Sequence, residues 1–253
     1  MQQDSTQIGG QVRSFPTTQW NLIQSLRSCA PEIKNQILDG LIARYWKPVY
    51  YFVRSQGHGN EEAKDLVQGF FAACLERDAL AQADVARGRF RTFLLTALTN
   101  YMRNVHRDGN AQKRRPAGGI LSLDALVDAE DVAFQPPTNE TPEHIFSRTW
   151  AQDLVHRVLR ALEDECAVTG KQDHFALFRA RIIEPALEGT KAPSLAELAP
   201  RFGITEKQAA NYVLTARRAY QRLLRDEIST YALSEEDAAE EVGNVYNMLG
   251  HSQ

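Results

Sequence analysis

Apolar residues recur at every third or fourth position along most of this chain, which is the period of an α-helix. The first such segment covers residues 33–53 and contains Pro48, where a kink is predicted. Helices are also predicted over 63–75, with Asn60 as a candidate N-cap, and over 90–105. No segment sustains the alternation of apolar and polar residues that marks a half-buried strand. The pattern therefore predicts an all-α fold.

The sharpest local signal lies between residues 194 and 208. Ser194 and Glu197 have the spacing of a capping box, which predicts the start of a short helix. Gly203 then allows a tight turn, and Thr205 with Gln208 forms a second capping box at the start of a long helix. A short helix, a glycine turn and a long helix are the layout of a helix-turn-helix.

A helical projection separates the long helix into two sides. Apolar residues gather on one side: Ala209, Val213, Ala216, Tyr220, Leu223 and Leu224. The other side is polar: Lys207, Gln208, Asn211, Thr215, Arg218 and Arg222. Such side chains can bind base edges and phosphates in a major groove, but they also suit a solvated surface. The turn glycine, the two capping boxes and the absence of acids on this side favour DNA binding.

The third predicted helix carries a similar polar and basic stripe opposite its apolar side. Four residues recur there at helical spacing: Asn100, Arg103, Asn104 and Arg107. Asparagine can pair with a base edge, and arginine can bind guanine or phosphate. Phe90 and Tyr101 could stack on an unpaired base, although aromatic residues at this spacing more often belong to a core.

The distribution of charge supports two polyanion-facing surfaces. The 253 residues are 24% charged and carry a formal net charge of only −3. Basic residues nevertheless concentrate at 87–115 and 201–225, whereas acidic residues dominate 122–144 and the tail after 225. Two solvated helix faces would give the same pattern, so charge by itself does not decide between the two interpretations.

Composition and the positions of proline and glycine predict two helical domains. Residues 116–144 are rich in proline, glycine and acids, which is typical of a linker. The predicted organisation is a helical domain at 15–115, this acidic linker, a second domain at 145–230 with the helix-turn-helix, and an acidic helical tail at 231–253.

Other classes of protein find little support. No run of 18 apolar residues and no secretory signal is present, so a cytoplasmic protein without a membrane partner is expected. Cys29, Cys74 and Cys166 lack the paired spacing of a metal site, and no cofactor motif occurs. Cys166 and His174 could be a nucleophile and a base, but we interpret them as a surface cysteine near a surface histidine and expect no enzymatic activity.

In these residues and in their order, the chain resembles the extracytoplasmic-function sigma factors of bacterial RNA polymerase, in the sigma-70 superfamily. The resemblance extends over about residues 15–250 and rests on the order of several motifs. These are DLVQGFF at 65–71, RFRTFL at 89–94 followed by Asn100 and Arg107, and the helix-turn-helix. The phrases TPE at 141–143 and RTWA at 148–151, with the ending 242–250, resemble a subgroup common in planctomycetes and related bacteria.

The resemblance implies a function and its residues. The helix of Asp65, Gln68 and Glu76 would bind core RNA polymerase. Arg91 and the stripe of the third helix would melt and read the −10 element of promoter DNA, and the long helix would read the −35 element. The partners would be core polymerase, promoter DNA and, as a further candidate, an anti-sigma factor or other regulator.

The chain departs from this family in three places. Family members commonly have aspartate where Asn104 stands, the segment 163–193 is longer than the usual connector, and the acidic tail is an addition. An extra helix is predicted within 171–185. We hypothesise that the tail folds back on a basic surface and weakens DNA binding by the free protein.

Two other functions remain as alternatives. One is a stand-alone helix-turn-helix regulator, which would usually dimerise to read two half-sites. No heptad seam long enough for a dimer is evident. The other is an adaptor that no longer reads DNA, and the presence of the basic stripes argues against it.

Overall fold

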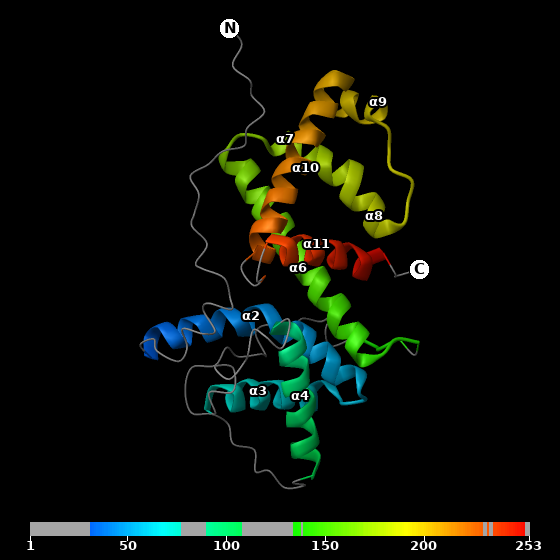
Figure 1. Cartoon of the computed structure of the whole chain (residues 1–253). Coiled ribbons are helices and arrows are strands. Elements are labelled where there is room, and N and C mark those ends of the chain that lie inside the picture. Colours follow the sequence, from blue (N-terminus) through cyan, green and yellow to red (C-terminus); the bar gives the residue numbers. More distant parts are fainter. Residues whose placement is uncertain are drawn as a thin grey trace. The chain divides into compact units, whose positions relative to one another are not determined.

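The structure is a computed structural model, and it describes residues 31–76, 90–107, 134–137, 139–229, 232 and 235–250 (Figure 1). All regular secondary structure within these residues is helical, with no strand among them. The prediction of an all-α fold is therefore confirmed. In the described parts of the chain, no helix combines the length and apolarity needed to cross a bilayer.

The chain divides into two compact units. Within the described residues, the α2–α4 unit contains those between 31 and 153 and those from 229 to 250, two segments that are distant in sequence. The α7–α10 unit is the continuous segment Leu154–Ile228. The division falls inside helix α6 (Pro142–Val168), whereas the sequence placed a domain start at 145. Most of the predicted linker, from 116 to 133, lies outside the described residues.

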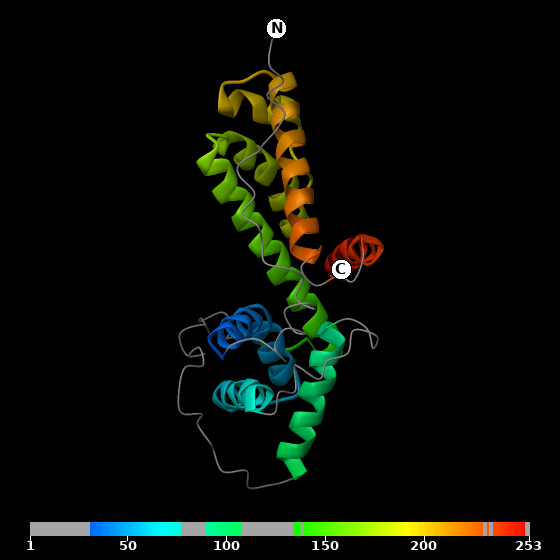
Figure 2. The same cartoon turned by 60° about the vertical axis from the view of Figure 1, so that its left-hand side comes forward.

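Three amphipathic helices form most of the α2–α4 unit: α2 (Pro31–Ser55), α3 (Asn60–Glu76) and α4 (Phe90–Arg107). Helix α2 runs beside α3 in both views (Figures 1 and 2). Aromatic side chains join the helices, since the Tyr45 and Phe90 rings lie 5.3 Å apart and those of Phe52 and Phe146 6.4 Å apart. The core of this unit is therefore built by the predicted apolar positions.

The start of α3 differs from the prediction. The amide of Ala63 donates to the carbonyl of Gly59, so Gly59 rather than Asn60 occupies the N-cap. Asn60 is the first helical residue, and its side-chain oxygen accepts a hydrogen bond of 2.7 Å from the Tyr50 hydroxyl. The Asn60 side chain thus links α3 to α2 through a hydrogen bond. A capping rule, which considers only residues within one helix start, does not include such a contact.

The acidic tail forms helix α11 (Glu235–Gly250), which belongs to the α2–α4 unit. Its buried side chains follow a helical seam formed by Ala238, Glu241 and Val245. Glu241 makes an ion pair with Arg91 of α4, and the Arg91 guanidinium lies 4.6 Å from the centre of the Trp150 ring. The tail therefore packs on this unit and pairs with an arginine whose side chain is only 11% exposed, whereas the sequence suggested a basic surface.

The α7–α10 unit contains the rest of α6 and six further elements. They are α7 (Gln172–Phe178), a π-helical turn η4 (Arg179–Ile183), α8 (Glu184–Glu188), α9 (Leu195–Leu198), a 3-10 turn η5 (Ala199–Phe202) and α10 (Glu206–Ser229). Ion pairs join α10 to the C-terminal part of α6, Arg157 with Glu227 and Arg222 with Glu165. The long segment 163–193 thus contains the additional helix that the sequence predicts.

This additional helix supplies part of the core beneath the predicted helix-turn-helix. Leu177 of α7 packs with Leu198, Ala199 and Ala209 in one buried cluster, which Ile204 covers from the turn. The segment that departs from the resembled family therefore supports the two helices that follow it.

Both cysteines within the described residues are buried, which corrects one interpretation. Cys166 is fully buried in α6, so it is not a surface cysteine. Burial raises the pKa of its thiol, and the Glu165 carboxylate raises it further. Burial raises the pKa of Cys74 to about 12. Neither thiol is suited to be a nucleophile, because the thiolate is the reactive form.

We therefore expect Cys74 and Cys166 to resist a thiol reagent at pH 8 in the native protein and to react after unfolding in guanidinium chloride. The measurement is the absorbance of the thiolate that an aromatic disulfide reagent releases when it reacts with a protein thiol. It is made in a Cys29→Ser background so that only these two thiols are counted. Rapid labelling of either thiol in the native state would contradict the buried packing.

Candidate nucleic-acid interface

Two capping boxes, one at the start of α9 and one at the start of α10, and one glycine between them are present as predicted. The Glu197 amide donates to the Ser194 hydroxyl at 3.2 Å, and the Glu197 carboxylate accepts from the Ser194 amide at 2.6 Å. Gly203 has a φ of 64°, in the left-handed region that favours glycine. The second box joins Thr205 and Gln208 through two reciprocal hydrogen bonds. These contacts fix the angle at which α10 leaves the turn.

A continuous exposed stripe runs along α10 and is the first candidate surface. Its members alternate in steps of four and three residues: Lys207, Asn211, Leu214, Arg218, Gln221 and Arg225. We call this set the α10 stripe. It carries three cations and no acid, and its polar side chains are donors and acceptors of the kind that bind base edges and phosphates.

Thr215 does not belong to this exposed surface, which corrects the helical projection. Its exposed fraction is only 7%. Helix α10 is buried over a wide arc, because pairs of adjacent residues such as Thr215 with Ala216 and Ala219 with Tyr220 are covered every turn. A helix packed on two sides buries more of its circumference than the single apolar stripe suggests.

Gln208 is exposed, but its side-chain oxygen serves the capping box. That oxygen accepts from the amide and the hydroxyl of Thr205, each at 2.9 Å. A glutamine that pairs with adenine needs both its amide oxygen and its amide nitrogen. Gln208 therefore contributes to shaping the turn, and pairing with adenine would require it to give up the cap.

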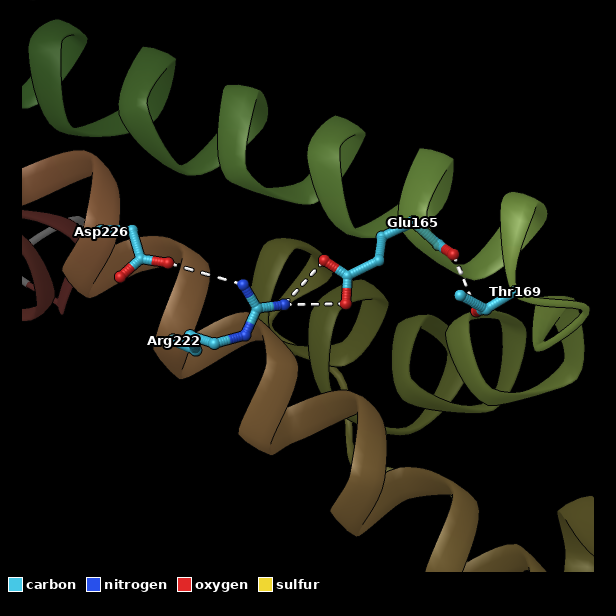
Figure 3. Close-up of polar contacts among 4 residues, drawn as sticks. All are labelled: Glu165, Thr169, Arg222 and Asp226. Carbon is cyan, nitrogen blue, oxygen red and sulfur yellow. Dashed lines mark hydrogen bonds and ion pairs between the residues drawn. The ribbon is translucent and has the colours of Figure 1, made fainter. Parts of the chain in front are cut away.

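Arg222 is also engaged within the protein. One of its terminal nitrogens donates to both carboxylate oxygens of Glu165, at 2.8 and 2.7 Å, and the other lies 3.5 Å from Asp226 (Figure 3). Figure 3 shows the guanidinium lying between the carboxylates of α6 and α10. Arg222 thus ties α10 to α6, and a phosphate would have to compete with Glu165 for it.

The second candidate surface is the exposed side of α4. The predicted stripe is exposed at Asn100, Arg103, Asn104 and Arg107. Thr92 and Thr96 extend it toward the start of the helix, and the Thr96 hydroxyl donates to the Thr92 carbonyl at 2.9 Å. We call these six residues the α4 stripe. Its side chains combine two amides, two guanidinium groups and two hydroxyls on one face.

Arg91, which the resemblance implies as a contact to the −10 element, does not lie on the α4 stripe. A helical period places it on the same side as Phe90, Leu94 and Leu98, all of which are buried. Its side chain is 11% exposed and is paired with Glu241. The resemblance assigned Arg91 to DNA binding because of its position in the motif. Its side chain instead lies on the buried side of α4 and pairs with Glu241.

The residues predicted to bind polymerase lie on α3. Asp65 is exposed and Gln68 is half-buried. Glu76 is the last residue of the helix, and its side chain lies outside the described residues. Of the two members whose side chains are described, Asp65 is therefore the more accessible.

Phe90 and Tyr101 could have stacked on an unpaired base, but both pack against aromatic rings of their own unit. Phe90 is 2% exposed, and the Tyr101 ring lies 5.7 Å from that of Phe70 in an edge-on contact. The interpretation that favoured a core role is confirmed for Phe90, whereas Tyr101 is half-buried and packs against Phe70. The basic cluster at 113–115, expected to contact the DNA backbone, lies outside the described residues.

His174 contacts α10 directly behind the helix-turn-helix. Its ring stacks on that of Tyr212 with 3.8 Å between the centroids and 15° between the planes. Burial lowers the pKa of His174, and the Lys171 charge lowers it further, while Asp173 opposes the shift. The neutral ring is therefore the form that packs in the folded state.

This shift predicts a loss of stability in acid. The unfolded state binds a proton at a pKa of about 6.5, above that of folded His174. The contribution of His174 is consequently present above pH 6.5 or so, and it declines as the pH falls through the folded pKa. We expect the free energy of unfolding, measured by urea titration, to fall less between pH 7.5 and pH 5.5 in His174→Gln than in wild type. The exposed His156→Gln on α6 is the matched control, and equal pH dependence in both variants would contradict the assignment.

Within the described residues, no group of three or more His, Cys, Asp and Glu side chains is placed to hold a metal ion. Comparison of the chain with models of known families, with curated proteins and with solved structures finds no match. The arguments about function therefore depend on the two stripes, the Asp65 surface and the resemblance in sequence.

Sequence reasoning missed part of both stripes. Leu214, Gln221 and Arg225 belong to the α10 stripe, and Thr92 and Thr96 to the α4 stripe. All five follow at helical spacing from residues that the sequence did indicate. Extending each stripe by steps of three and four in both directions would have found them.

Proposed function

We propose that this protein is a sigma factor that binds core RNA polymerase and directs promoter-specific initiation of transcription. It acts by binding rather than by catalysing a reaction. The α2–α4 unit docks on polymerase through the α3 surface around Asp65 and engages the −10 element with the α4 stripe. The α7–α10 unit reads the −35 element with the α10 stripe. This role places the protein in the cytoplasm of a bacterium.

One observation carries the proposal: each of the two compact units presents its own polar and basic stripe on one face of one helix. A protein that contacts two separate promoter elements needs two such surfaces. The α10 stripe includes Lys207, Asn211 and Arg218, and the α4 stripe includes Asn100 and Arg103, all of them exposed. The order of the units along the chain supports the same assignment through the resemblance.

The structure changes which residues we propose as contacts. Thr215 is buried, and the side chain of Arg91 is only 11% exposed and paired with Glu241, so both are left out. Arg222 is assigned to holding α10 against α6. Arg225 joins the proposed contacts at the far end of the α10 stripe. Cations at the two ends of a stripe suit phosphates on either side of a groove.

Alanine substitutions in the α10 stripe test this assignment. Arg218→Ala and Asn211→Ala should each weaken recognition of the −35 element by about 1–3 kcal/mol if the contact is to a base. The control is Arg160→Ala, which removes an exposed arginine from α6 of the same unit. Titration of promoter duplexes with the polymerase complex measures the difference. Equal affinities for all three variants would remove the α10 stripe from the proposal.

A stand-alone DNA-binding regulator is the second candidate function. The capped turn and the α10 stripe favour it as much as they favour a sigma factor, because a single helix-turn-helix suffices for an operator half-site. The α4 stripe and Asp65 would then have no assigned role. Operator binding by a dimer, without polymerase, distinguishes this candidate.

The tail remains a proposed regulator of DNA binding. Helix α11 places the exposed acids Glu235, Glu236 and Glu240 on the unit that carries the α4 stripe. Removing residues 234–253 would test this role, but it would also remove a partner of Arg91. Replacing Glu235 and Glu236 by Gln keeps the ion pair, and it should raise the affinity of the free protein for promoter DNA at low salt. Unchanged affinity would remove the hypothesis.

A further inference from the structure

Leu214 is an exposed leucine in the middle of the α10 stripe. Its exposed fraction is 45%, and it lies one helical turn from Asn211 on one side and from Arg218 on the other. The other large apolar side chains that are exposed within the described residues lie elsewhere, Val168 at the end of α6 and Ile182 in the π-helical turn. A single exposed leucine needs no explanation by itself, but its place between two candidate base contacts does.

The chemistry of base edges offers one partner for such a side chain. In the major groove, the bases present hydrogen-bond donors and acceptors, and thymine alone adds a methyl group at C5. An α-helix rises about 1.5 Å per residue, so Leu214 lies about 4.5 Å along the axis from Asn211 and about 6 Å from Arg218. These steps correspond to between one and two base pairs, at about 3.4 Å each.

Charge favours DNA over a protein as the occupant of this surface. Leu214 is flanked along the stripe by Lys207, Arg218 and Arg225, with no acidic side chain in the stripe. A protein partner that buried Leu214 would also have to neutralise these cations. DNA supplies the phosphates for the cations and an apolar methyl group for the leucine on the same face.

We propose that Leu214 reads a thymine through its C5 methyl group. The inference rests on the proposed DNA-reading role of α10 and deepens it, because it assigns a base type to one position of the helix. Asn211 and Arg218 would then contact the base pairs or phosphates on either side of that thymine.

The test uses the full chain, both alone and with core RNA polymerase, and begins by selecting bound duplexes from a random pool. Each thymine of the selected site is then replaced by deoxyuridine, which removes only the methyl group. We expect one replacement to weaken binding about four-fold, the effect of one buried methyl group. In Leu214→Ala the same replacement should have no effect, whereas Val168→Ala should keep the wild-type response.

The outcomes distinguish a failure of the DNA-reading role of α10 from a failure of the inference about Leu214 alone. If no sequence is enriched, the DNA-reading role of α10 fails and the inference falls with it. If a site is enriched but no thymine responds, or if Leu214→Ala keeps the response, only the inference about Leu214 is overturned. A protein partner would then be the better explanation for this side chain.

Discussion

Glu241→Ala is expected to lower the free energy of unfolding of the α2–α4 unit by about 3–5 kcal/mol, because it removes one partner of a buried ion pair with Arg91. The Glu241 and Arg91 side chains are only 3% and 11% exposed, so water cannot replace the lost carboxylate without moving α11. A loss of this size is a large part of the stability of a typical domain. Urea titration followed by circular dichroism measures it.

Two further variants show whether the buried charge is the cause. Glu235→Ala removes an exposed carboxylate from the same helix and should change stability by no more than about 0.5 kcal/mol. The double variant Arg91→Met with Glu241→Leu removes both charges and should recover most of the loss, since apolar residues can replace a buried ion pair at little cost. If Glu241→Ala resembled Glu235→Ala, the ion pair would not hold α11 in place.

Gly69→Ala is expected to destabilise the same unit by about 1–2 kcal/mol although alanine favours a helix. A Cβ at position 69 would overlap the Tyr101 hydroxyl and lie 3.5 Å from the carbon that bears it. Gly69 therefore lets α4 approach α3 closely, which gives a structural reason for the glycine in the DLVQGFF motif. Thermal or urea unfolding measures the change.

Two comparisons isolate the steric cause. Gly40→Ala, inside α2 where no atom lies within 4 Å of a Cβ, should instead raise the stability by about 0.5–1 kcal/mol. Tyr101→Phe removes the overlapping hydroxyl, so Gly69→Ala should cost less in that background than in wild type. The same cost in both backgrounds would show that the hydroxyl does not limit position 69.

Local signals were sufficient at the starts of α9 and α10, although not at the start of α3. The two capping boxes and the left-handed Gly203 follow from residue types at fixed spacing, and the structure has all three. The apolar period likewise predicted the helices and most of the core. Such features need no knowledge of what lies across the fold.

Contacts between segments distant in sequence decided the rest. Arg91 meets Glu241 across 150 positions, and Arg222 meets Glu165 across 57, so neither pair was visible in a local pattern. Thr215 is buried because α10 is covered on a second side, which a projection of one helix cannot reveal. These three changes in the predicted DNA-binding set come from tertiary packing, whereas Gln208 is engaged locally by its own capping box.

Binding of the labelled full chain to bacterial core RNA polymerase at physiological salt tests the proposed function most directly. The account predicts tight, saturable binding that Asp65→Ala weakens and that Asp39→Ala, an exposed carboxylate on α2, leaves unchanged. Fluorescence anisotropy gives the three dissociation constants under the same conditions. Absence of saturable binding would contradict the assignment as a sigma factor and leave a stand-alone DNA-binding protein. Equal affinities for the two variants would remove the α3 surface from the polymerase contact.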